Sequence, residues 1–261
     1  MPDQEYPPNK LIAATAAPKH LSSFRSDLAS RLQSGSHLIL HGPRGSDKST
    51  LVTSMLEHFR SQSIPCAIAP QTMGLADVVT ALSQAYPDTD IQPLGRRAMG
   101  VRLRLAADRI PGVLLLDHTR EVTTAMIGFM RRLKGGIIGA LFVVDIDSEF
   151  ERNRLVDWRR HAPRVRMPLM PNRRLQRLLG YAWVARNLPE IDTRTRRHIV
   201  RAARGRIGWL RECIRRLEVP EYWSGGRLHV STICTDCELV IRQSRKGPRG
   251  GRQFRRQQYS A

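Results

Sequence analysis

The stretch from residue 37 to residue 56 constrains the fold more than any other part of the chain. It opens with an apolar run, Leu38–Leu40, which predicts a short buried strand. A glycine-bearing turn follows, and then a helical pattern whose apolar side chains recur on one face: Leu51, Val52, Met55, Leu56 and Phe59. Strand, glycine-bearing loop and helix in this order form the context of a phosphate-binding P-loop.

The residues at the start of this helix suit an anion. A helix N-terminus presents unpaired backbone N–H groups and the positive end of the helix dipole, and both favour a phosphate. Lys48 would reach the β- and γ-phosphates of ATP, and the hydroxyl of Ser49 would ligate Mg²⁺. The predicted nucleotide site comprises the whole loop: Gly42, Pro43, Arg44, Gly45, Ser46, Asp47, Lys48, Ser49 and Thr50.

Asp47 departs from the P-loop pattern. The pattern Gly-x-x-x-x-Gly-Lys-Ser/Thr has glycine at this position, because a residue without Cβ lets the backbone approach the phosphates closely. Asp47 adds a Cβ and a negative charge beside an anion. The alternative interpretation is an ordinary strand–turn–helix unit that binds no nucleotide.

A second motif follows at residues 112–118, with the sequence Gly-Val-Leu-Leu-Leu-Asp-His. It predicts a buried parallel strand with a carboxylate at its C-terminal edge, where open α/β sheets bind ligands. In this Walker B pattern, Asp117 would hold Mg²⁺ through water. The alternative interpretation is an aspartate that only terminates the strand. The next residue is usually the Glu that orients the attacking water, but it is His118 here, with Glu121 as a weak substitute.

A third apolar run, residues 137–146, predicts another buried strand. Asp145 or Asp147 would lie at its far end and sense the γ-phosphate through the attacking water. An aspartate that merely forms a turn is the alternative.

Strands and helices alternate along the first two thirds of the chain. Short strands are expected at 66–69 and 164–168, and helices at 21–32, 74–86, 94–109 and 122–133, although Val101–Leu105 alternates with period two. This order predicts βαβ units and the parallel sheet of a three-layer αβα P-loop NTPase. After Pro171 the pattern is helical, ending with a helix at 229–243. The predicted domains are an extended arm (1–19), a P-loop core (20–168), a helical lid (169–241) and a disordered basic tail (242–261).

The charge balance favours a polyanionic partner. The chain has 43 Lys and Arg against 23 Asp and Glu, a net charge of +20, and nucleic acid, with DNA favoured, is the usual partner of such a protein. Seven basic residues and no acidic one lie between Arg242 and Arg256, which suits binding to phosphates without sequence preference. A solvated surface that is merely rich in arginine is the alternative.

The four cysteines do not form a disulfide framework in a chain of 261 residues. Cys234 and Cys237 lie on the apolar stripe of the last predicted helix, so a core role is favoured over a zinc site. No apolar run is long enough to span a membrane and no signal peptide is apparent, so a cytoplasmic protein without a membrane partner is expected.

The P-loop, the Leu-Leu-Leu-Asp strand and the helical segment after the last strand together resemble the AAA+ superfamily, and within it the origin-recognition-like and transposition-helper ATPases. The segment 203–214 is similar to the family's second sensor, which implies that Arg206, or failing that Arg204, reaches the γ-phosphate. Arg159 and Arg160 match the position of the arginine finger, which acts on the nucleotide of a neighbouring subunit and implies a homo-oligomer.

The resemblance implies an ATPase that acts as an oligomeric, nucleotide-dependent switch on DNA, as a helper in transposition, replication or repair. Its protein partner would be of the recombinase or transposase kind. Asp47 and His118 suggest weak hydrolysis. The alternative is a hydrolysis-deficient P-loop scaffold, or a signalling module, that binds a protein partner.

Overall fold

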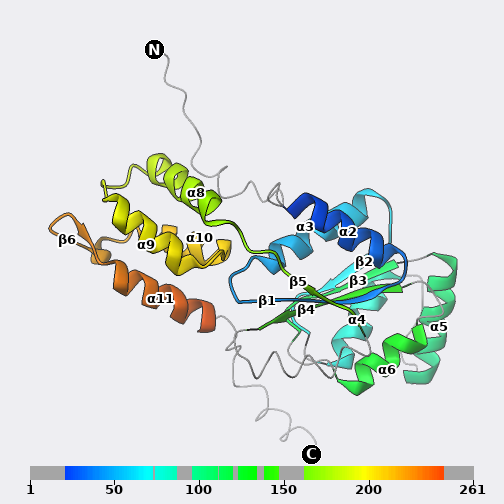
Figure 1. The fold of residues 1–261 in the computed structure, drawn as a ribbon. Coiled ribbons are helices and arrows are strands. Elements are labelled where there is room, and N and C mark those ends of the chain that lie inside the picture. Colours follow the sequence, from blue (N-terminus) through cyan, green and yellow to red (C-terminus); the bar gives the residue numbers. More distant parts are fainter. Residues whose placement is uncertain are drawn as a thin grey trace, which may run out of the picture. The chain divides into compact units, whose positions relative to one another are not determined.

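The computed structural model describes residues 21–72, 74–86, 96–110, 112–119, 123–133, 138–146 and 162–243 (Figure 1). The chain forms two compact units. One comprises Met1–Pro43 and Asp47–Pro168, and the other comprises Arg44–Ser46 and Leu169–Ala261. The predicted arm at 1–19 lies outside the described residues.

A parallel sheet of five strands forms the centre of the first unit. The strands are β1 (His37–Gly42), β2 (Cys66–Ala69), β3 (Gly112–Leu116), β4 (Ile138–Asp145) and β5 (Arg164–Arg166). Their spatial order is β2-β3-β4-β1-β5, and every neighbouring pair is parallel. The predicted fold class, a parallel αβα sheet followed by a helical part, is therefore confirmed.

Helices cover both faces of this sheet, and the strands alternate their side chains between the two layers. Leu38 and Leu40 pack with α2 (Ser22–Gln33) and α3 (Lys48–Ser61). Ile39, one residue out of step, packs in the opposite layer. That layer contains α4 (Leu75–Ala85), α5 (Arg96–Arg109) and α6 (Thr124–Leu133). Because both faces are covered, all five residues of β3 are buried.

The alternating run in α5 is helical, in agreement with the helix expected at 94–109. Leu103 is fully buried against the sheet, whereas Val101 and Leu105 are more than half exposed. Of the described side chains of Val101–Leu105, only Leu103 faces the core. The alternation of apolar and polar residues in this run therefore does not indicate a strand.

Four helices make up most of the second unit: α8 (Asn172–Ala185), α9 (Thr193–Ala203), α10 (Ile207–Arg216) and α11 (Val230–Gln243). They enclose a core that includes Leu179, Trp183, Trp209 and the two buried cysteines, Cys213 and Cys237. Neighbouring Cys237 and burial raise the pKa of the Cys213 thiol, which favours the neutral thiol.

Helix α11 includes residues 242 and 243, the first two residues of the expected tail. Arg242 and Gln243 are the last residues of α11, because Ile241 continues the apolar stripe that packs into the core of this unit. Residues 244–261 lie outside the described part of the chain.

A small hairpin between α10 and α11 was not predicted. The strands β6 (Trp223–Ser224) and β7 (Arg227–Leu228) pair antiparallel after a 3₁₀ turn at Pro220–Tyr222. Gly225 and Gly226 both have positive φ, which a two-residue hairpin turn with two left-handed residues requires. Gly225 and Gly226 are therefore the turn of this hairpin.

Candidate nucleotide-binding site

Lys48 begins helix α3 at the C-terminal edge of the sheet and is buried. Its ammonium donates to the carbonyl oxygens of Gly42 at 3.0 Å and Pro43 at 2.8 Å. It also forms an ion pair with Asp145, in which Nζ lies 2.7 Å from Oδ1. Both charged side chains are more than nine-tenths buried, so this is a desolvated pair.

Strand pairing explains why these residues meet. Gly42 ends β1 and pairs in register with Asp145, the last residue of β4. The carboxyl ends of parallel strands meet at one edge of the sheet, so the loop after β1 and the carboxylate at the end of β4 are neighbours. The sequence predicted both elements, but the direct ion pair was not foreseen, because strand order cannot be derived from single strands.

Asp47 adopts the left-handed conformation, with φ 71° and ψ 31°. This is the position where the P-loop pattern has glycine, and a non-glycine residue there carries backbone strain of about 1–3 kcal/mol. The Asp47 carboxylate accepts a hydrogen bond from the hydroxyl of Thr50 at 2.7 Å. Asp47 therefore adopts the turn conformation that glycine would adopt. The hydroxyl of Thr50, in the same helix, holds the Asp47 carboxylate at the N-terminus of α3.

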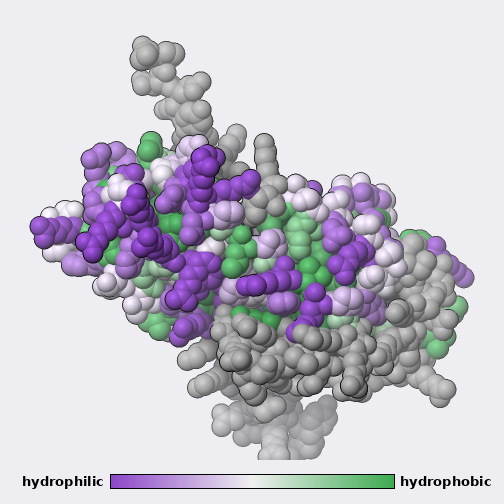
Figure 2. Space-filling view, in the orientation of Figure 1, coloured by the Kyte–Doolittle hydropathy of each residue, from purple (hydrophilic) through white to green (hydrophobic). Residues whose placement is uncertain are grey.

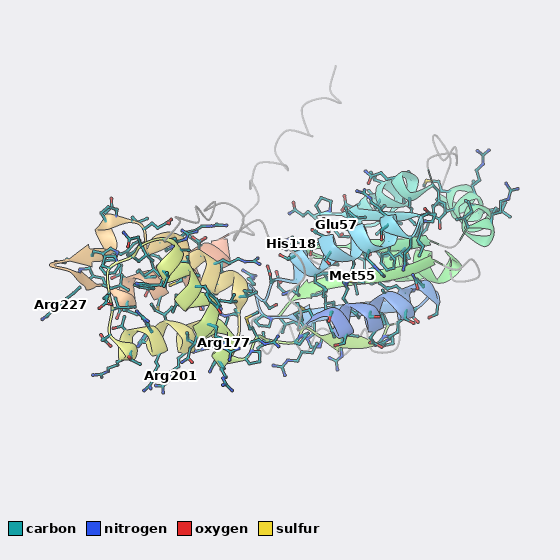
Figure 3. The ribbon with its side chains drawn as sticks, turned by 90° about the horizontal axis from the view of Figure 1, so that it is seen from above. Met55, Glu57, His118, Arg177, Arg201 and Arg227 are labelled. Carbon is teal, nitrogen blue, oxygen red and sulfur yellow. The ribbon has the colours of Figure 1, made fainter. Side chains whose placement is uncertain are left out.

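The third part of the site is the turn after β3. Asp117 is buried, and its Oδ1 accepts from the backbone N–H of His118 at 2.8 Å. His118 has a positive φ of 44°, and its Nε2 lies 3.3 Å from the Ser49 hydroxyl. The same ring lies 3.9 Å from carboxylate oxygens of both Asp117 and Asp145. Figure 3 shows His118 next to helix α3.

One constellation thus contains Lys48, Ser49, Asp117, His118 and Asp145, drawn from three segments of the chain. Its donor set fits a nucleotide that carries Mg²⁺. Such an ion needs only one or two protein oxygens and completes its shell with phosphate and water. Ser49 and Asp117 offer such oxygens, at 3.3 and 3.9 Å from the same nitrogen of His118. Within the described residues, no cluster of three or more His, Cys, Asp or Glu forms a metal site by itself.

The tip of the loop, Arg44–Ser46, belongs to the helical unit. The backbone N–H of Gly208 donates to the carbonyl of Gly45 at 2.9 Å, which satisfies one of the free donors at the start of α10. A Cβ on Gly45 would lie 3.0 Å from Ile241 Cδ1 and 3.2 Å from Trp209 N. This contact was not predicted. A Cβ at position 208 would lie 3.0 Å from the Gly45 carbonyl oxygen, so the glycine there permits the close approach.

Arg206 is held inside the helical unit. Its guanidinium forms an ion pair with Glu238 of α11, and it donates to the carbonyl oxygens of Ala202 and Ala203. It also lies over the ring of Trp209. Arg204, the alternative residue, is exposed and caps α9 with a positive φ. The γ-phosphate role that the resemblance implies for either residue stays a prediction.

Four predicted residues fall outside the described part of the chain: Glu121, Asp147, Arg159 and Arg160. Their roles as catalytic base, sensor and arginine finger stay predictions. Among the described residues, no helix has both the length and the apolar character that a membrane span requires.

Sheet, loop and buried acidic turn define a P-loop αβα fold with a helical C-terminal part. No protein-family model matches the chain, and comparison with curated protein sequences finds no match. Among solved structures, the chain is similar to domain III of the Thermotoga maritima replication initiation protein DnaA. The TM-score is 0.47 and the identity 13%, over 88% of this chain and 96% of that one.

Two further matches are of the same kind. The Thermotoga maritima RuvB Holliday junction branch migration motor matches with a TM-score of 0.42 and 17% identity, over 85% of this chain and 67% of that one. C. elegans PCH-2 matches with a TM-score of 0.42 and 12% identity, over 86% and 68%. None of the three matches reaches a TM-score of 0.5 or an identity of 25%.

Proposed function

We propose that this protein is an ATP-binding switch of the AAA+ type that acts on DNA as an oligomer. The observation that carries the proposal is the constellation around Lys48, in which a buried cation, a hydroxyl and two buried carboxylates meet at the start of one helix. A helix N-terminus with a lysine and an adjacent hydroxyl is built for a polyphosphate.

Four residues of the constellation have a defined role in this proposal. Lys48 binds the β- and γ-phosphates, and Ser49 with Asp117 holds Mg²⁺, which would neutralise phosphate charge when bound. His118 is placed against Ser49, where the Walker B pattern has its glutamate neighbour. His118 lacks the carboxylate that orients the attacking water in that pattern, and its Nε2 is in contact with the Ser49 hydroxyl, so slow turnover is expected.

The proposed partners rest on charge. A net charge of +20 steers the chain to a polyanion, and the proposed role is that of a helper in DNA transposition, replication or repair. The γ-phosphate would set the packing of subunits, with Arg159 and Arg160 as candidates for contact with a neighbour's nucleotide. A recombinase or transposase is the proposed kind of protein partner.

Nucleotide titration of the purified protein tests the proposal. Wild type should bind ATP in the presence of Mg²⁺, Lys48→Ala should bind far more weakly, and Asp47→Gly should bind more tightly. Absence of binding by both wild type and Asp47→Gly would end the ATPase proposal. Measuring whether the protein binds duplex DNA in a salt-sensitive way with ATP present tests the proposed action on DNA.

A second candidate function is a P-loop scaffold that holds a protein partner without hydrolysis. The specific observation in its favour is the ion pair of Lys48 with Asp145, since it occupies the lysine that would otherwise meet phosphate. ATPase rates separate the two candidates. A wild-type rate equal to that of Lys48→Ala supports the scaffold, and a clearly higher wild-type rate supports the enzyme.

A further inference from the structure

Six arginines are exposed on two neighbouring helices of the helical unit. Helix α8 carries Arg173, Arg174 and Arg177, and helix α9 carries Arg194, Arg197 and Arg201. We refer to these six residues as the α8–α9 arginine face.

Helical periodicity puts these side chains opposite the core. In α8 the buried residues are Leu175, Leu179 and Trp183, and in α9 they are Ile199, Val200 and Ala203. Both sets pack into one shared cluster, so the two helices turn their remaining sides to solvent. Figure 3 shows Arg177 of α8 and Arg201 of α9 projecting from the same side of this unit, whereas Arg227 projects from its far end. Figure 2 shows that hydrophilic side chains dominate the drawn side of the helical unit.

Several carboxylates of the unit are engaged with other groups. Glu218 pairs with Arg186, Glu238 with Arg206, and Glu212 with both Arg215 and Arg216. Asp192 caps α9 by accepting from the backbone of Thr195, and this hydrogen bond lowers the pKa of its carboxyl. Within the described residues, none of the six face arginines has a carboxylate within ion-pair distance.

The composition of the unit matches this arrangement. Residues 169–243 contain fifteen arginines, no lysine and seven acidic residues. Like charges gathered on one face repel one another, and a polyanion removes that repulsion. The planar guanidinium offers two parallel donors to a phosphate, which the ammonium of lysine does not.

We propose that the α8–α9 arginine face binds the phosphate backbone of duplex DNA without reading its sequence. This rests on the proposed function, which assigns the chain a DNA partner. Arg194 and Arg201 are seven residues apart, so the row on α9 spans about 10 Å at 1.5 Å per residue. Duplex DNA carries a phosphate charge about every 1.7 Å of its axis, counted over both strands, so about six phosphates lie along that span and those on the facing side can meet the arginines.

Backbone contact alone is the expected mode. Arginines spread over the outer sides of two packed helices form a broad face rather than one protruding recognition element. Contacts to phosphates fix position and carry no sequence information directly. Affinity should therefore be similar for duplexes of different sequence and should fall steeply with salt.

Charge-matched triple variants of the full chain test this proposal. Arg194→Gln, Arg197→Gln and Arg201→Gln together remove three charges from the face. Arg60→Gln, Arg109→Gln and Arg227→Gln together remove three charges from exposed positions elsewhere. The readout is binding to a fluorescent duplex, with ATP present, over a series of salt concentrations. A third protein, with Arg194→Lys, Arg197→Lys and Arg201→Lys together, keeps the charge, and circular dichroism with thermal melting checks that all variants fold.

The glutamine face variant should lower the slope of log affinity against log salt by about 2.7, which is 0.9 for each lost contact. At about 0.1 M salt its affinity should fall on the order of a hundredfold. The control variant should stay close to wild type, and the lysine variant should keep most of the slope. The basic segment after residue 243 is present in every protein and so contributes equally.

Equal losses in the face and control variants would show that only net charge matters, and would overturn the proposal while leaving the proposed function intact. A wild-type protein that binds ATP but no duplex would refute the DNA role and this inference with it. Binding of the wild type to phosphatidylserine vesicles, but not to duplex, would likewise assign the face to a membrane surface and overturn the proposal.

Discussion

The ion pair between Lys48 and Asp145 predicts that neutralising Asp145 has opposite effects on stability and on nucleotide affinity. The two side chains are more than nine-tenths buried, and Lys48 Nζ lies 2.7 Å from Asp145 Oδ1. A bound phosphate would have to share or displace Asp145 as the partner of Lys48. In Asp145→Asn the amide oxygen can still accept from Lys48, but the charge is gone.

The expected magnitude follows from these contacts. Removing one partner of a buried ion pair outright costs about 3–5 kcal/mol. Lys48 keeps its bonds to the Gly42 and Pro43 carbonyls in the variant, so the loss should be closer to that of one charge-assisted hydrogen bond, about 1.5–3 kcal/mol. If the same interaction opposes phosphate binding, removing it should tighten ADP binding by about ten- to a hundredfold, since each 1.4 kcal/mol is a factor of ten.

Two measurements check this prediction: urea unfolding without nucleotide, and calorimetric titration with ADP, which lacks the γ-phosphate that Asp145 is predicted to sense. Asp27→Asn is a matched control, because Asp27 pairs with Arg31 at 3.7 Å on the exposed surface of α2. It should change stability by less than about 1 kcal/mol and leave ADP affinity unchanged. Weaker ADP binding by Asp145→Asn would refute the reasoning, because Asp145 would then support the ligand rather than compete with it.

Three other substitutions have defined outcomes. Asp47→Gly removes the backbone strain of a left-handed residue and should raise the free energy of unfolding by about 1 kcal/mol. Asp47→Asn should stay near wild type, because asparagine tolerates the same φ. Urea unfolding measures both variants. Gly45→Ala should lower the melting temperature, because position 45 has a φ of 74° and the added Cβ would crowd Ile241. Gly180→Ala in α8 is the control and should not lower the melting temperature, because no atom lies within 4 Å of the added Cβ. Burial alone would raise the pKa of Glu238, but hydrogen bonds and charge from Arg206 outweigh it and hold that pKa below 4.5. The stability from this carboxylate is therefore present above pH 4.5 and lost as the pH falls further, so in acid-unfolding curves Glu238→Gln should flatten that part of the transition.

Much of the site could be predicted because its pieces are local. The P-loop at 42–50 and the apolar strand ending at Asp117 are short segments whose composition and order specify a strand, a turn and a helix. The phosphate loop, the acidic strand end and the helical character after Pro171 were all found in this way, and the structure contains each of them. The β6–β7 hairpin was not predicted although its turn, Gly225-Gly226, is also local, because each of its strands has only two residues and gives no alternating pattern.

Other features depend on distant parts of the chain. The contact of His118 with Ser49 joins residues 69 positions apart, and the contact of Gly208 with Gly45 joins different helices and loops. Neither leaves a periodic pattern, because one hydrogen bond constrains only the two residues that form it. The six-arginine face likewise needs the packing of α8 on α9, since the sequence alone shows arginines without the surface they share.

The sequence by itself determined the class of fold and the position of the strand, loop and helix at 37–56, because hydrophobic periodicity and turn residues act within a few positions of one another. Only the tertiary structure decided that Lys48 is paired with Asp145. That pairing exists because β4 lies next to β1 in the sheet, and strand order is set by how the whole core packs.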